Sequence, residues 1–279
     1  MSGALPSGAC DTHCHVFGPQ AHFPYAPGRT TPFEAPKEAL FAMHRRYGFD
    51  RAVIVHPNLH GFDNSVTLDA IAASGGAYRG VALVPDDVTS DGLRALDAGG
   101  IRGVRFNFPK HLGPPPSEST VRRIGELIAP LGWHVLLHVM PEHLETAWAY
   151  VKPLNVPVVI DHMARVSTAD GVDDRAFRRL LEMASDPRCW VKISGGDRAS
   201  ATGAPFDDAV PFARAILETA PQRTLWGTDW PHPNVKGPTP QEDDLVSLLH
   251  KIVPEEDLLR QVLVDNPDRL YRFDERSAG

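Results

Sequence analysis

The sequence predicts a single (β/α)8 barrel that spans residues 1–279. Three observations support this expectation. Apolar runs typical of buried strands recur along the chain, segments with helical periodicity lie between them, and polar side chains gather where the runs end. Strands that alternate with helices indicate a parallel sheet, and in a barrel of this kind the catalytic groups lie at the carboxyl ends of the strands.

Eight apolar runs are expected to form the strands of the barrel. Two of them contain the tripeptides 135–137 (Val-Leu-Leu) and 158–160 (Val-Val-Ile), which are apolar throughout, as in strands that are covered on both faces. The expected strands are 9–15, 51–56, 78–83, 103–107, 133–138, 156–161, 190–194 and 224–229.

Helices are expected between the strands because apolar side chains recur there with helical periodicity. The stretch 17–36, which follows the first strand, is rich in proline and glycine and is too polar and broken for regular structure. We expect it to form a long loop over the barrel mouth. The expected helices include 36–47, 117–131, 174–184, 207–220 and 243–252.

Length, composition and charge indicate which classes of protein this chain can belong to. A chain of 279 residues with 42% hydrophobic content can bury a large core, and its formal net charge of −7 offers no basic field for a nucleic acid. No run approaches membrane-spanning length and residues 1–9 do not resemble a secretory leader, so a cytoplasmic protein is expected. Cys10, Cys14 and Cys189 lack the spacing and even number of a disulfide framework or a thiolate zinc site.

The most informative motif is 11–15, Asp-Thr-His-Cys-His, at the end of the first expected strand. Residues two apart in a strand share a face, so His13 and His15 are expected to point the same way, while Cys14 faces away and packs against the barrel. Such a pair can chelate a divalent cation or hydrogen-bond a reacting carbonyl. An isolated His-x-His is explained equally well by two structural polar residues, so its weight depends on the other strand ends.

Polar side chains also lie at the other strand ends. Because the carboxyl ends of the strands meet on one rim, these groups are expected to converge with the two histidines. Asp161 is expected to lie outside the ring of reacting groups and to orient its neighbours. The groups are Arg105 and Asn107 at the end of the fourth strand, His138 at the end of the fifth, His162 after the sixth and Asp229 at the end of the eighth.

Together these segments resemble the amidohydrolase superfamily, and within it the lactonase branch, with the greatest similarity to 2-pyrone-4,6-dicarboxylate lactonases. The resemblance runs from about residue 9 to residue 273. It implies hydrolytic opening of a small lactone in the degradation of aromatic compounds. The segments that carry it are 11–19, 102–108, 132–135, 160–163, 226–233 and the terminal 266–271.

Roles for the rim residues follow from the chemistry of ester hydrolysis, which needs an activated water, a base and groups that stabilise the developing oxyanion. Asp229 is the expected general base. His13, His15 and His162 are expected to polarise the carbonyl, either directly as hydrogen-bond donors or through a bound metal ion. The residues leave both routes open.

The resemblance is informative about metal binding at one position, that of His138. Pyrone-dicarboxylate lactonases are thought to work without metal and carry a tyrosine where this chain has His138. A histidine there restores the superfamily set of His13, His15, His138 and Asp229. We therefore expect one divalent cation, most simply zinc, although the family that this chain resembles most can be metal-independent.

The substrate is expected to be a small anionic lactone. Arg105, Arg198 and Lys110 offer cations for a carboxylate or sulfonate. Asn107 and His60 are expected either to hydrogen-bond ring substituents or to hold loops in place. Any single arginine is explained equally well by a structural ion pair, and the resemblance favours a substrate contact for Arg198.

Two departures from the family pattern bear on which lactone is opened. A further substrate arginine has no counterpart because His111 follows Lys110, and residues 29–31 (Arg-Thr-Thr) stand where a substrate tyrosine is expected. An acidic lactone of the pyrone-dicarboxylate, muconolactone or sulfomuconolactone type is therefore expected. The alternatives are a metal-dependent decarboxylase of the same superfamily and a non-catalytic barrel that binds an anion.

Overall fold

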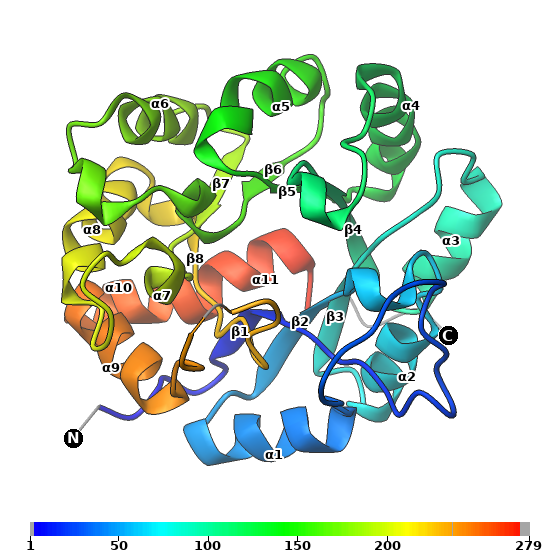
Figure 1. Ribbon diagram of the computed structural model, residues 1–279, viewed down its shortest axis with the longest axis horizontal. Coiled ribbons are helices and arrows are strands. Elements are labelled where there is room, and N and C mark those ends of the chain that lie inside the picture. The colour runs from blue at the N-terminus through cyan, green and yellow to red at the C-terminus, as the bar shows by residue number, and fades with distance from the viewer. Residues whose placement is uncertain (1–2, 236, 274–279) are drawn as a thin grey trace.

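The computed structural model describes residues 3–235 and 237–273, and these form a (β/α)8 barrel, which confirms the expected fold (Figure 1). Consecutive strands pair in parallel, in the order β1 to β8. The strands are β1 (Cys10–Cys14), β2 (Arg51–Val55), β3 (Tyr78–Ala82), β4 (Ile101–Asn107), β5 (His134–His138), β6 (Val158–Ile160), β7 (Cys189–Lys192) and β8 (Thr224–Leu225).

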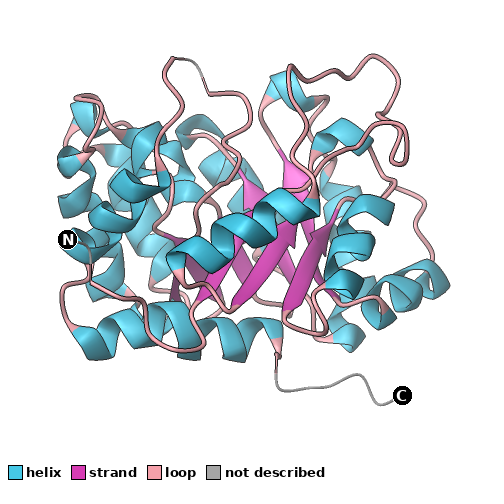
Figure 2. Cartoon of the chain, turned by 90° about the horizontal axis from the view of Figure 1, so that it is seen from below, coloured by secondary structure: helices cyan, strands magenta, loops and turns pink. Residues whose placement is uncertain are grey.

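Helices surround the barrel, and the loops at the carboxyl ends of the strands gather on one side of it (Figure 2). The five expected helices are present with small shifts at their ends. The helices are α1 (Lys37–Tyr47), α2 (Ser65–Ala73), α3 (Ser90–Ala98), α4 (Glu118–Ile128), α5 (Leu144–Val151), α6 (Arg175–Ala184), α7 (Gly196–Ala199), α8 (Val210–Thr219), α9 (Glu242–Ile252), α10 (Glu256–Arg260) and α11 (Asn266–Tyr271).

Two buried clusters hold these layers together. The inner cluster fills the barrel with branched side chains from the strands and is joined by Leu270 and Tyr271 of α11, which covers the end where the strands begin. The outer cluster lies between strands and helices and includes Cys14 and Leu40, so Cys14 packs outward as expected. Each fully buried aliphatic side chain contributes about 1.5–3 kcal/mol to folding. The inner strand residues include Val53, Val55, Val81, Leu136, Val159 and Leu225.

The barrel closes between β1 and the segment that follows β8. β8 is shorter than the expected strand 224–229, because beyond Leu225 this segment reaches β1 through separate contacts. Thr12 N donates to Trp226 O at 3.1 Å and Asp229 N donates to His13 O at 2.8 Å. A side chain on Gly227 would put its Cβ 2.4 Å from the His13 nitrogen, so only glycine permits this approach.

Asp11 fixes the same closure from the outer face of the barrel. Its buried carboxylate accepts hydrogen bonds from the Thr228 nitrogen at 3.0 Å, the Thr228 hydroxyl at 2.6 Å and the His13 backbone nitrogen at 3.0 Å, and it lies 3.1 Å from His44 Nε2. A buried carboxylate that has partners on two elements resists relative movement of those elements. Asp229 is therefore held beside His13.

The stretch 17–36 forms an irregular loop, as expected, with one antiparallel bridge between Phe17 and Ala35. Arg29 in this loop donates to the carbonyl oxygen of Leu112 at 2.8 Å, which ties it to the loop after β4. Within residues 3–235 and 237–273, no helix combines the length and apolarity needed to cross a membrane.

Candidate active site

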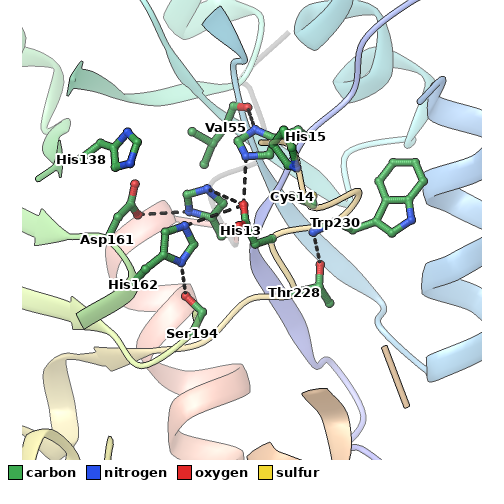
Figure 3. A network of polar contacts seen from close by, with 12 residues as sticks. His13, Cys14, His15, Val55, His138, Asp161, His162, Ser194, Thr228 and Trp230 are labelled. Carbon is green, nitrogen blue, oxygen red and sulfur yellow. Dashed lines mark hydrogen bonds and ion pairs between the residues drawn. The ribbon is translucent and has the colours of Figure 1, made fainter. Parts of the chain in front are cut away.

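Three histidines surround one carboxylate at the carboxyl end of the barrel. The Asp229 Oδ1 atom lies 3.2 Å from His15 Nε2, 3.7 Å from His13 Nε2 and 3.8 Å from His162 Nε2. All four side chains are buried. Figure 3 shows the histidines directed toward a common centre. The structure therefore brings together the four residues that were expected to carry the catalysis.

A left-handed turn places His162 in this cluster. Residues 162–165 follow β6 and all have φ between 48° and 54°, a conformation that costs roughly 1–2 kcal/mol per residue. Gly195 makes room for the turn, because a Cβ there would lie 2.7 Å from the His162 Cβ. His162 Nδ1 then lies 3.0 Å from the Ser194 hydroxyl. Strain of this size persists where the surrounding structure fixes it, as at functional sites.

A second set of buried groups lies behind His13. His13 Nδ1 is 3.1 Å from Asp161 Oδ1, and the Lys192 ammonium nitrogen is 3.0 Å from the same His13 nitrogen and 3.2 Å from Asp161 Oδ1. Arg105 Nη2 reaches Asp161 Oδ2 at 3.6 Å. Asp161 thus orients His13, as expected. The sequence-based reasoning missed Lys192, although a lysine inside the apolar run 190–194 was a signal of a buried charge.

Electrostatics favour neutral forms of His13 and His162 beside an ionised carboxylate. Burial lowers the pKa of His13 to about 3, and burial also holds the pKa of His162 well below its ordinary value. For Asp229, burial alone would raise the pKa, but the positive charge of Arg198 opposes it and the pKa is well below the usual range. The Arg198 guanidinium, which is a permanent charge, donates to Asp229 Oδ2 at 2.7 Å. Asp229 is therefore an unprotonated base at neutral pH.

Arginines lie around the opening of the site. Arg198 also pairs with Asp197 at 3.2 Å, and Arg105 is buried within the barrel. The sequence-based reasoning missed Arg165. The left-handed turn places Arg165 at the cavity, and burial and the charge of Arg198 lower the pKa of its guanidinium. Arg165 and Arg198 line a cavity of about 1650 Å³ together with Lys110. The same cavity is also lined by the carboxylates Glu142, Asp197 and Asp244, so an anionic ligand would be bound by the arginines individually rather than by a net positive wall.

Other predicted residues lie apart from the central cluster. Lys110 is exposed on the wall of the cavity, and His60 Nδ1 donates to the Pro24 carbonyl oxygen at 3.0 Å within the loops. His138 Nδ1 lies 3.0 Å from Asn107 Oδ1. In the part of the chain that the structure describes, no group of three candidate ligand atoms within 4.8 Å of one another includes His138.

The donor set at the centre fits a divalent cation. Ligand atoms of His13, His15 and Asp229 all lie within 4.8 Å of one another. The buried His13 Nε2 has no hydrogen-bond partner among the described residues, and His15 Nδ1 donates to the Val55 carbonyl oxygen at 2.7 Å, which leaves the lone pair of a neutral ring on Nε2. Two imidazole nitrogens and a carboxylate oxygen are ordinary zinc ligands.

A (β/α)8 barrel with histidines from β1, a histidine after β6 and an aspartate after β8 defines an amidohydrolase. The Amidohydrolase family matches residues 10–273, and the chain belongs to this family, which confirms the family inferred from the motifs.

The similar proteins narrow the family further. The chain is 43% identical over 277 residues to a 2-pyrone-4,6-dicarboxylate hydrolase of Comamonas testosteroni, covering 96% of this chain and 91% of the relative. It is 42% identical over 275 residues to a 4-sulfomuconolactone hydrolase of Rhizobium radiobacter, covering 97% and 92%. A crystal structure of a probable 2-pyrone-4,6-dicarboxylic acid hydrolase of Acinetobacter baumannii superposes with a TM-score of 0.85 at 27% identity, covering 95% and 99%.

Proposed function

We propose that this amidohydrolase opens a small acidic lactone by hydrolysis in the degradation of aromatic compounds. The observation that carries the proposal is the ionised Asp229 among three buried histidines, beside a cavity whose lining includes Arg165 and Arg198. The names of the similar proteins, hydrolases of a pyrone dicarboxylate and of a sulfomuconolactone, support the same activity.

The proposed reaction adds one water across the ring ester. Asp229 accepts a proton from the water as the water oxygen attacks the lactone carbonyl, and the histidine cluster stabilises the negative charge that forms on the carbonyl oxygen. The bond between the carbonyl carbon and the ring oxygen then breaks. Asp229 returns the proton to the departing ring oxygen, which leaves an open-chain acid with one new carboxyl group.

We also propose that His13, His15 and Asp229 hold one divalent cation, most simply zinc. When bound, such an ion would polarise the carbonyl and lower the pKa of the attacking water. His138 is the proposed fourth ligand, although its ring must approach the other three to coordinate the same ion. Without a metal, His13 and His162 could act on the carbonyl only as hydrogen-bond donors.

The anionic groups of the substrate are proposed to face the arginines. A guanidinium binds a carboxylate or sulfonate through two parallel hydrogen bonds, and Arg105, Arg165 and Arg198 lie closest to the centre. Lys110, Asn107 and His60 are proposed to contact more distant parts of the substrate or the loops that enclose it. We also propose that the protein is cytoplasmic and that the chain forms a single domain.

Neither alternative function gains support from the comparisons. A decarboxylase would release carbon dioxide, and an anion-binding barrel would leave its ligand unchanged, whereas the similar proteins are named as hydrolases. The test is incubation of the purified chain with 2-pyrone-4,6-dicarboxylate, 4-sulfomuconolactone and a neutral lactone of similar size. Mass spectrometry should show the gain of one water by an acidic lactone. Loss of carbon dioxide, or binding without conversion, would contradict the proposal.

A further inference from the structure

The buried ring of His138 has one hydrogen-bonded nitrogen and one without a partner. His138 ends β5 directly beside Asn107, its register partner at the end of β4. The His138 Nδ1 atom lies 3.0 Å from Asn107 Oδ1. The Nε2 atom is buried and has no hydrogen-bond partner among the described residues. Figure 3 shows the ring on the same side of the barrel as the other labelled histidines.

A chain of amide hydrogen bonds continues from Asn107 to a backbone carbonyl. Asn107 Nδ2 donates to Asn58 Oδ1 at 2.9 Å, and Asn58 Nδ2 donates to the Leu112 carbonyl oxygen at 3.1 Å. Arg29 Nη2 donates to the same carbonyl oxygen at 2.8 Å. A carbonyl oxygen can only accept, so it fixes which end of the Asn58 amide faces it.

The remaining orientations follow in order. Because the Asn58 nitrogen faces Leu112, its oxygen faces Asn107, and Asn107 must present its nitrogen to Asn58 and its oxygen to His138. Rotating either amide by half a turn would bring two acceptors or two donors together. An oxygen that faces His138 Nδ1 requires a proton on that nitrogen.

The surroundings also keep the ring neutral. His138 is buried, and its Nε2 faces no hydrogen-bond acceptor among the described residues, so a second ring proton would have no partner. A neutral ring with its proton on Nδ1 carries a lone pair on Nε2. His15 shares the contact at Nδ1, which donates to the Val55 carbonyl oxygen, but its Nε2 lies 3.2 Å from Asp229 Oδ1.

We propose that Asn107 and Asn58 are positioning residues that hold His138 in the Nδ1–H tautomer, so that Nε2 presents a fixed lone pair to an electron-pair acceptor in the active site. The acceptor is either a divalent cation or a proton of the substrate or of a bound water. The inference rests on the proposed function only where it places that acceptor in an active site. The tautomer itself follows from the hydrogen bonds.

The test reads the tautomer directly. In the full chain labelled with ¹⁵N-histidine, two-bond correlations from the ring protons distinguish a protonated ring nitrogen from an unprotonated one, and His138→Gln assigns the signals. In the wild type at neutral pH, Nδ1 should be protonated and Nε2 should not. Asn107→Leu removes the acceptor and should abolish this preference. Asn58→Asp keeps an acceptor for the Asn107 amide and should preserve it.

The His15 signals serve as an internal control, because its bond to the Val55 carbonyl should survive in both variants and shows that the rim remains folded. A wild-type His138 with its proton on Nε2 would overturn the proposal, as would an unchanged tautomer in Asn107→Leu. Addition of Zn²⁺ distinguishes the two acceptors. A shift of the His138 Nε2 signal identifies a cation as the acceptor, whereas an unmoved signal in protein whose other rim histidines respond to Zn²⁺ rules out zinc at Nε2. Lactonase activity enters none of these readouts, so a failed function leaves them interpretable.

Discussion

Replacement of Asp229 by asparagine separates its role as a base from its role in the structure. The amide is the same size as the carboxylate, its oxygen can still accept from Arg198, and its nitrogen can donate to the lone pair of His15 Nε2, 3.2 Å from the present oxygen. It cannot accept the proton of water. General base catalysis contributes about 10²–10⁴-fold, so kcat should fall by that factor, which corresponds to about 3–5 kcal/mol in the activation barrier.

The assay follows lactone opening by the loss of ring absorbance, with urea unfolding measured on the same preparations. Asp197→Asn is the matched control, because Asp197 also pairs with Arg198 at 3.2 Å but, within the described residues, makes no hydrogen bond or ion pair with the three central histidines. It should lower kcat far less than Asp229→Asn does. A folded Asp229→Asn variant that turns over at the wild-type rate would refute the assignment of Asp229 as the base.

Three further predictions concern the buried charges and the metal. Lys192→Met removes the positive charge beside the buried Asp161 carboxylate and should lower the free energy of unfolding by about 3–5 kcal/mol. Adding Asp161→Asn to this variant should restore part of the loss. Equal urea unfolding of Lys192→Met and the wild type would contradict the prediction. Burial lowers the pKa of His56 to about 3, so the unfolded chain binds the extra proton below about pH 6.5 and stability should fall as pH drops from there toward 3. His56→Gln should flatten that fall by about 1.4 kcal/mol per pH unit, and an unchanged slope would show that His56 does not titrate on unfolding. Removal of metal by a chelator should reduce activity and zinc should restore it, whereas full activity in protein shown to be metal-free by elemental analysis would mean that the histidines act on the carbonyl directly.

The barrel was predictable because its strands coincide with apolar runs in the sequence. Residues 158–160 show this most simply, since a strand covered on both faces needs no alternation. The expected eighth strand was too long, because Gly227 and Thr228 leave the ladder to meet His13 and Asp11 through contacts between distant parts of the chain. No local pattern in the sequence encodes such a contact.

The central histidines and Asp229 were predictable for a different reason. Once strands are placed, a residue at a carboxyl end is placed on the rim. Arg165 escaped this reasoning because it lies five residues beyond the end of β6, and only the left-handed turn from His162 returns it to the cavity. A run of non-glycine residues with positive φ depends on tertiary packing, here on the space beside Gly195, and has no signature in propensity.

The most direct test of the account is to follow an acidic lactone through turnover in water enriched in heavy oxygen, with wild type and Asp229→Asn compared at equal concentration. Hydrolysis with Asp229 as the base requires that the wild type incorporates one heavy oxygen into the new carboxyl group and that the variant does so about 10²–10⁴ times more slowly. Conversion that releases carbon dioxide without incorporating solvent oxygen would contradict it, as would equal rates for the two proteins.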